Sequence, residues 1–235
     1  YIKFFKTAVP VGICVGTYMN SEAIFKVIEQ AKLSEAKTSA FHHMMEDKVY
    51  KLHLIIGLHN EDQAQCLVKF ATEYIEMAPR VMECVAACAK EANADFLFEP
   101  LLEKAYNYFI NPTVIFSHYT GLDGLLMKAY LCHRLLEEMY ENNKSIRNSK
   151  LCAVEVTQAN LLAHQLIGEP FANELDESAL ITVKEIAGTP DYYNLNLNIF
   201  VEQAQHQAWN WMREYWQNLL SRNHIQLHFS YRNVF

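Results

Sequence analysis

Ten histidines and 27 acidic residues make a metal site or an acid–base pair the first chemistry to look for in this sequence. Imidazole nitrogens and carboxylates bind divalent metal ions, and a positioned histidine or carboxylate can also transfer protons. Two such side chains share one face of a helix when they lie four residues apart. Chance predicts about two His–acid pairs at this spacing in a chain of this composition, and the chain contains four. The four pairs are His42/Glu46, His43/Asp47, His133/Glu137 and Glu202/His206.

The direction of each pair on its predicted helix separates them, because the count alone does not identify a site. Winding the helices at about 100° per residue places three of the pairs on solvent-facing or flanking surfaces. His133 instead falls within the apolar arc of its helix, with His118 in the same arc and Glu137 at its edge. Glu155 falls near the middle of the apolar stripe of the next helix. Carboxylates that face a core must be paired, hydrogen-bonded, metal-bound or protonated, so these four residues form the candidate site.

Two interpretations of this cluster remain open. In the first, the cluster binds a divalent metal ion or a small molecule, or supplies an acid–base pair, between helices 112–142 and 150–167. In the second, the same side chains form a polar network, with His133 paired to Glu155, that fixes the register of the two helices. We favour the second interpretation, since buried polar side chains are most often hydrogen-bonded to the protein itself.

Known catalytic motifs give the first interpretation no support. A carboxylate-bridged di-iron bundle of the ferritin-like kind requires Glu-x-x-His on each of two helices, and this chain contains no Glu-x-x-His. The sequence also lacks GxGxxG, a Walker loop, HExxH and GxSxG. The nearest glycine-rich piece, Gly121-Leu-Asp-Gly124, lies within a helical pattern and predicts a close helix crossing or a kink. The reaction and the substrate are therefore left unassigned.

Helices must position these residues, because the sequence has the composition of a helical globular protein. Hydrophobic residues make up 51% of the chain, and only seven glycines and six prolines are present, too few for the many turns of an all-β fold. Apolar residues recur at helical spacing along most of the chain. The predicted helices are one capped at Asn20 or Ser21, then 39–56, one that begins near Asn60, 100–110, 112–142, 150–167, 174–187 and 192–221.

The pattern predicts one all-α domain, a bundle of six to eight helices over residues 1–235. The predicted parts are an extended segment 1–19, a helical bundle 20–222 and a strand-like tail 223–235. Alternating apolar residues at 8–15 and 225–232 are typical of strands. We expect these two strands to pair with each other or with another subunit.

Charge and cysteine usage limit the classes of partner. The net charge of −7 argues against binding to nucleic acid or an anionic membrane, which both need a clustered basic face. The apolar run near residue 8 is too short to span a bilayer as a helix. Six cysteines are scattered with no CxxC pair or zinc spacing. We therefore expect buried free thiols and a reducing, cytoplasmic compartment.

Two function classes follow from these observations. The first is a helical-bundle protein that binds a metal or a small molecule between helices 112–142 and 150–167. The alternative is a non-catalytic interaction or regulatory module that acts as a homo-oligomer. Trp209 and Trp216 flank the apolar stripe of the last predicted helix, whereas Trp211 lies on it, so the flanking tryptophans are candidates for a subunit contact.

Overall fold

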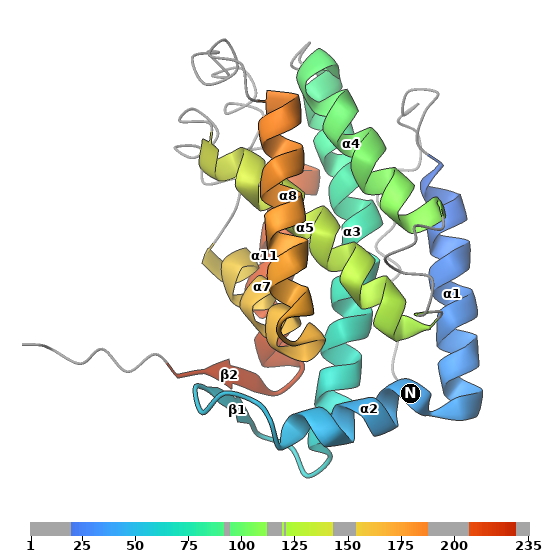
Figure 1. Ribbon diagram of the computed structural model, residues 1–235, viewed down its shortest axis with the longest axis vertical. Coiled ribbons are helices and arrows are strands. Elements are labelled where there is room, and N and C mark those ends of the chain that lie inside the picture. The colour runs from blue at the N-terminus through green and yellow to red at the C-terminus, as the bar shows by residue number, and fades with distance from the viewer. Residues whose placement is uncertain are drawn as a thin grey trace, which may run out of the picture.

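The computed structural model describes residues 20–91, 95–111, 119, 121–142, 154–187 and 207–228, and this part of the chain is an all-α bundle (Figure 1). Its eight helices and two short strands confirm the predicted fold class. The helices are α1 (Ser21–Thr38), α2 (Ala40–Val49), α3 (Gln63–Glu91), α4 (Asp95–Ile110), α5 (Leu122–Asn142), α7 (Val154–Ile167), α8 (Phe171–Ala187) and α11 (Gln207–Arg222). The strands are β1 (Ile56–Leu58) and β2 (Ile225–Leu227).

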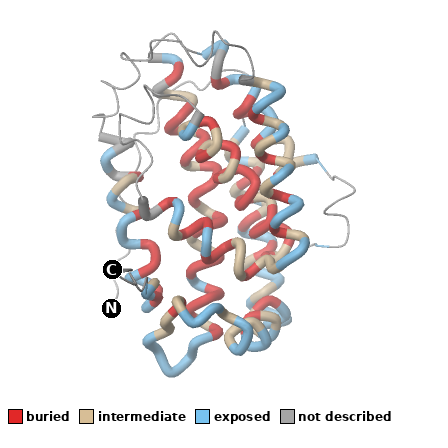
Figure 2. The backbone as a smooth tube through the Cα atoms, turned by 60° about the vertical axis from the view of Figure 1, so that its left-hand side comes forward, coloured by how far each residue is buried: buried red, intermediate tan, exposed pale blue. Residues whose placement is uncertain are grey.

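The core lies around α3 and α5, which pack against each other and together contact the other helices of the bundle. α3 contacts α1, α2, α4 and α11, while α5 contacts α1, α4, α7 and α8. Figure 2 shows buried residues running along the inside of the bundle, with exposed residues on its outer surfaces. Tyr74 on α3 and Tyr130 on α5 are among the largest fully buried side chains. The two central helices therefore determine where buried polar groups can meet.

Side-chain caps start two of the helices. Asn20 caps α1 as predicted, since its side-chain oxygen accepts the N–H of Ala23 at 3.2 Å. For α3 the prediction of a cap at Asn60 is displaced by two residues. Asp62 accepts the N–H of Gln65 at 2.9 Å, and Asn60 instead accepts the N–H of Asp62 at 3.3 Å. The helix then continues past Pro79 to Glu91.

The start of α5 differs from the prediction of a helix that includes both glycines. Residues 112–118 lie outside the described part of the chain, and α5 begins at Leu122, after a bend at Gly121. Asp123 accepts the N–H of Gly121 at 3.0 Å and so holds this bend. A Cβ on Gly124 would lie 2.4 Å from the carbonyl oxygen of Tyr119. Gly124 therefore accommodates the chain that enters α5. The sequence predicts a close helix crossing or a kink: the atoms nearest to that Cβ belong to Tyr119 and not to a crossing helix, and the chain bends at Gly121.

The predicted helix 39–56 is too long at its end. α2 ends at Val49, and residues 56–58 form β1, which pairs antiparallel with β2 in the register Ile56↔Leu227, Gly57↔Gln226 and Leu58↔Ile225. A short apolar run is ambiguous between helix and strand, and the predicted helix wrongly includes Ile56, which belongs to β1. The strand predicted over 225–232 is found at 225–227, and its described partner is β1. The alternative partner, residues 8–15, lies outside the described part.

The structure tests part of the prediction that Trp209 and Trp216 form a subunit contact. Trp216 is only 5% exposed, so it belongs to the core and is not the surface contact predicted for it. The side chains of Trp209 and Trp211 lie outside the described part of the chain.

Cys66, Cys84 and Cys132 are buried free thiols, as expected, and burial raises the pKa of the Cys132 thiol to about 12. None of the described helices combines the length and the apolar character needed to cross a bilayer. The expectations about nucleic acid and the cytoplasm stay predictions.

Candidate functional site

Two of the four predicted site residues can be placed, and both are buried as predicted. His133 is 2% exposed and Glu137 is 4% exposed, both on α5. His118 lies outside the described residues, and Glu155 belongs to α7 without a described side chain. The expected packing of α5 against α7 is confirmed, because Glu137 near the end of α5 bonds to Thr157 near the start of α7.

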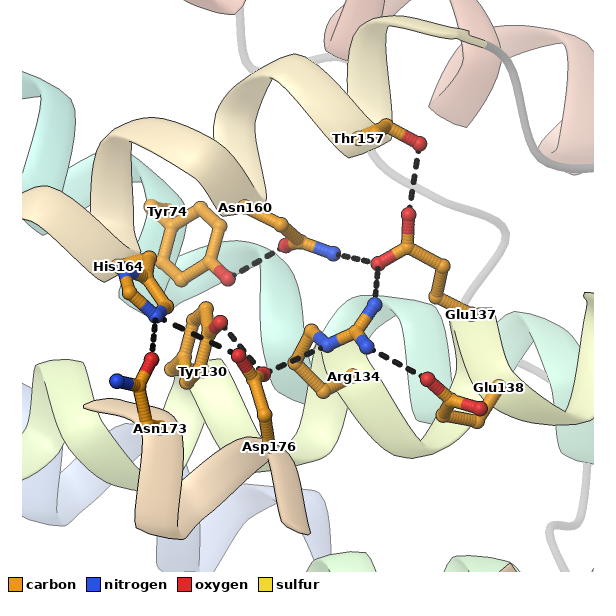
Figure 3. A network of polar contacts seen from close by, with 10 residues as sticks. All are labelled: Tyr74, Tyr130, Arg134, Glu137, Glu138, Thr157, Asn160, His164, Asn173 and Asp176. Atoms are coloured by element: carbon orange, nitrogen blue, oxygen red, sulfur yellow. Dashed lines mark hydrogen bonds and ion pairs between the residues drawn. The ribbon is translucent and has the colours of Figure 1, made fainter. Parts of the chain in front are cut away.

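The Glu137 carboxylate is surrounded by donors from two helices (Figure 3). The Thr157 hydroxyl donates to Oε1 at 2.6 Å, and the Asn160 amide donates to Oε2 at 2.6 Å. The Arg134 guanidinium, one turn earlier on α5, donates to the same Oε2 through Nη1. A buried carboxylate is tolerable only when it is paired and hydrogen-bonded, and here both conditions are met.

Asn160 extends these contacts to α3. Its side-chain oxygen accepts the Tyr74 hydroxyl at 2.7 Å, while its amide nitrogen donates to Glu137. Burial raises the pKa of Tyr74 well above its usual value, so the hydroxyl stays protonated and acts as the donor. One buried asparagine therefore joins α3, α5 and α7.

Arg134 connects the same network to α8. Its Nη2 donates to Glu138 at 2.6 Å, and its Nε donates to Asp176 at 2.9 Å. Asp176 also accepts the Tyr130 hydroxyl at 2.7 Å. Burial opposes the charge on Arg134, but the carboxylates of Glu137, Asp176 and Glu138 outweigh that effect and raise its pKa. The guanidinium thus forms ion pairs with three carboxylates on two helices.

His164 completes the connection between α7 and α8. Its Nε2 lies 3.0 Å from the Asn173 side-chain oxygen and 3.5 Å from Oδ2 of Asp176. The ring also packs edge-on against Tyr130, with centroids 6.1 Å apart. Figure 3 shows the resulting chain of contacts from His164 through Asp176 and Arg134 to Glu137.

His133 belongs to an aromatic cluster rather than to the carboxylates. Its Nε2 lies 3.1 Å from the backbone carbonyl oxygen of Tyr74, and because a carbonyl only accepts, Nε2 carries the proton. The ring packs against those of Tyr74 and Trp216, with centroids 4.5 Å and 4.9 Å away. Burial lowers the pKa of His133 to about 4, so the imidazole is neutral near pH 7.

The structure does not bring His133 and Glu137 to a common point, although they lie on one face of α5. His133 bonds toward α3, whereas Glu137 bonds toward α7. Over the described ranges, no three histidine, cysteine or acidic side chains gather closely enough to hold a metal ion. The described network provides hydrogen bonds between helices and neutralises buried charges.

Sequence reasoning missed most of the partners in this network. Arg134 lies three residues before Glu137 and four before Glu138, a spacing that indicates ion pairs on one helix face. Asn160 could have been found by the angular argument applied to Glu155, because it faces the same core. Asp176 had no local signal, since its partners lie on α5 and α7.

Known proteins provide no guide to these residues. Comparisons with protein families, with curated proteins and with solved structures find no match to this chain. Inference about function therefore rests on the geometry of the network and of the surface.

Proposed function

We propose that the protein is a non-catalytic helical interaction module, in which the buried polar network is architecture and not an active site. The hydrogen bonding of the Glu137 carboxylate within the protein carries this proposal. Of roughly four lone-pair sites on a carboxylate, three receive protein donors, from Arg134, Thr157 and Asn160. One site remains on Oε1, whereas Oε2 already accepts two donors, so a metal ion bound by both carboxylate oxygens would have to displace a hydrogen bond.

The surroundings of His133 support the same conclusion. A general base must reach the proton that it abstracts, directly or through one water molecule. His133 is enclosed by Tyr74 and Trp216, and its Nε2 is engaged by a backbone carbonyl. Its pKa of about 4, lowered by burial, also makes it a weak base near neutral pH.

The network has a clear structural role in this proposal. It connects α3, α5, α7 and α8 through side chains that are far apart in the chain. Fully satisfied buried networks rigidify a core and favour one arrangement of its helices. A bundle held in this way is suited to presenting a surface of constant shape.

The surface that we assign to interaction lies in the connection between α2 and β1. Tyr50 is 89% exposed and Leu54 is 96% exposed, only four residues apart. Tyrosine is enriched at protein interfaces, and two large side chains that are almost fully exposed in one short connection favour a contact site. The proposed partner is a second copy of the chain. Within the described residues, β1 and β2 each have a strand neighbour on one side only, and such edges can pair about a two-fold axis.

The first experiment distinguishes architecture from a metal site in the core. The protein and its His133→Ala variant are purified without chelators or a metal-binding tag, and their metal content and unfolding free energy are measured. We expect equal metal content, with the variant destabilised by about 2–4 kcal/mol from the cavity and the lost hydrogen bond. Near-stoichiometric metal that disappears in the variant would contradict the proposal and favour a site formed by His118, His133, Glu137 and Glu155.

The second experiment tests association. Light scattering over a wide range of protein concentration should give a mass that rises toward that of a dimer. The double substitution Tyr50→Ser with Leu54→Ser should keep the chain monomeric. The matched control is Leu33→Ser, which removes an exposed apolar side chain from α1 and should leave association unchanged. A monomeric wild type at every concentration would contradict the homo-oligomer.

A further inference from the structure

The solvent face of the β1–β2 ribbon carries two histidines, His59 and His228. His59 donates its N–H to the carbonyl of His224 at 3.0 Å, and His228 donates its N–H to the carbonyl of Ile55 at 2.7 Å. The antiparallel pairing therefore continues one residue beyond each end of the strands. Residues directly opposite one another share a face, and alternate residues along a strand do so too. His59 and His228 thus share the face of Gly57, and both are exposed. His224 is also exposed, but its positive φ of 59° takes it out of the strand alternation.

The other face of the ribbon packs on the protein. Ile56 and Ile225 are buried, and Leu58 and Leu227 are partly buried against the core. This burial fixes the register, because a slip of one residue would turn the apolar side chains outward. The histidine face is therefore held toward solvent by the packing beneath it.

Two of the imidazoles converge above Gly57. A Cβ on Gly57 would lie 2.8 Å from Nε2 of His228 and 3.3 Å from Nε2 of His59. The two ring centroids are 6.1 Å apart, and the rings are nearly perpendicular, at 86°. A glycine inside a strand often marks a site where other groups approach the backbone closely. Here the missing side chain leaves the space that both Nε2 atoms enter.

Both imidazoles are available for a ligand. Within the described residues, neither ring forms a hydrogen bond or an ion pair with another side chain. The His42 and His43 rings have similar spacing, with centroids 6.2 Å apart, but they have partners. His42 lies 3.6 Å from an Asp62 carboxylate oxygen, and Nδ1 of His43 lies 2.6 Å from the Ser39 carbonyl oxygen.

We propose that His59 and His228 bind a divalent transition-metal ion through their Nε2 atoms, above Gly57 on the solvent face of the ribbon. Imidazole nitrogen suits Cu²⁺, Ni²⁺ and Zn²⁺, and affinity for a given nitrogen site is highest for Cu²⁺. Binding requires each nitrogen to lie about 2.0–2.1 Å from the ion, and both side chains are exposed, so their rings can adjust to it. Water fills the remaining positions. Mg²⁺ is not expected to bind, because it prefers oxygen ligands.

The ion would link two distant parts of the chain. His59 lies in the connection between β1 and α3, and His228 directly follows β2. Metal that binds only the folded arrangement of both histidines stabilises that arrangement by mass action. This site does not depend on association of the chain or on the role of the core network.

Calorimetric titration of the full chain, first treated with a chelator and dialysed, tests the proposal. We expect one Cu²⁺ ion per chain with a micromolar dissociation constant, weaker binding of Zn²⁺, and no heat with Mg²⁺. His59→Asn and His228→Asn should each weaken Cu²⁺ binding by at least about tenfold. The electron paramagnetic resonance spectrum of the Cu²⁺ complex should show nitrogen coupling that both variants reduce.

Gly57→Ala is the sharpest variant, because it retains both imidazoles and closes the space between them. Gly57 lies in extended strand backbone that alanine adopts readily, so the variant should fold and bind Cu²⁺ more weakly. His43→Asn is the matched control and should leave Cu²⁺ affinity unchanged. Circular dichroism without metal checks the fold of each variant. Wild-type affinity in His59→Asn, His228→Asn or Gly57→Ala, or equal weakening by His43→Asn, would overturn the proposal.

Discussion

His133 and His228 illustrate two opposite surroundings for the same side chain. His133 lies in the core, where its Nε2 bonds to a carbonyl and two aromatic rings enclose it. His228 lies on the surface of the ribbon beside His59, with no side-chain hydrogen bond among the described residues. The buried histidine has the stronger contacts and the less available nitrogen.

The same contrast separates the two regions around these histidines. In the core network each acidic group is met by protein donors, so removing one partner leaves another group buried and unsatisfied. On the ribbon face the two imidazoles are exposed, and a ligand would not have to displace a described protein partner. Burial of a histidine near a carboxylate is therefore poor evidence for a binding site unless the lone pairs are also unoccupied. Predictions for single substitutions can break or sharpen this contrast.

The largest effect is expected for Arg134→Met in the core network. The substitution leaves Glu137, Glu138 and Asp176 without their shared cation, so chemical denaturation should show a loss of about 3–5 kcal/mol. The control is Arg222→Met, which removes a partly exposed ion pair with Glu73 and should cost only about 0–1 kcal/mol. Equal losses in the two variants would remove the energetic distinction between the regions.

The pH dependence of His133 should be the next largest effect. Burial lowers its folded pKa to about 4, below the unfolded value of about 6.5. The unfolded state therefore binds the proton first as the pH falls, and stability decreases from about pH 6.5 to pH 4 by up to about 3 kcal/mol. Above that window both states are neutral and the effect is absent.

The His133→Gln variant tests this window, because glutamine can still donate to the Tyr74 carbonyl but does not titrate. Denaturation between pH 7 and pH 4 should give a shallower loss of stability than in the wild type. His43→Gln, a change in a histidine near the surface, serves as the comparison and should retain the wild-type slope. If the unfolding free energy of His133→Gln fell with pH as steeply as that of the wild type, the pKa of His133 would not be lowered in the folded state.

Deletion of one buried hydroxyl should have an intermediate effect. Tyr74→Phe removes the donor to Asn160 and leaves the amide oxygen buried, so we expect a loss of about 1–2 kcal/mol in chemical denaturation. Tyr50→Phe removes a hydroxyl that faces water and should leave stability unchanged at low protein concentration. An unchanged unfolding free energy in Tyr74→Phe would indicate that the network tolerates an Asn160 side-chain oxygen without a donor.

The smallest effect is expected on the ribbon in the absence of metal. His228→Asn, measured in the presence of a chelator, should change the unfolding free energy by less than about 0.5 kcal/mol, as is usual for exposed positions. The midpoint of thermal unfolding should then rise on addition of Cu²⁺ in the wild type but not in the variant. A large loss of stability with chelator present would place His228 with the structural residues instead.

The sequence was informative where the cause of structure is local. Apolar periodicity identified the helices, and the angular position of His133 and Glu137 predicted their burial correctly. The sequence-based prediction is wrong where two alternatives have similar local patterns: the predicted helix 39–56 extends beyond Val49, where α2 ends, to Ile56, the first residue of β1. The pairing of His133 with Glu155 stays a prediction, since the Glu155 side chain is not described.

Partners in the network were hidden for a different reason. Asn160 and Arg134 join Tyr74, Glu137 and Asp176 only because α3, α5, α7 and α8 pack together. No spacing in the chain encodes which side chains face one another across helices. Gly57 had no sequence signal either. Its position beside His59 and His228 depends on the register of two strands that are far apart in the chain.

That register has a consequence for the order in which the molecule assembles. β1 precedes α3 and β2 follows α11, so forming the ribbon closes a loop that contains most of the helices. Loop closure of this size is entropically unfavourable until the intervening chain is already compact, and contacts between distant segments slow folding. The ribbon should therefore form late, after α3 and α5 have packed. The amide of His228, which bonds to Ile55, would then be a kinetic reporter for completion of the fold.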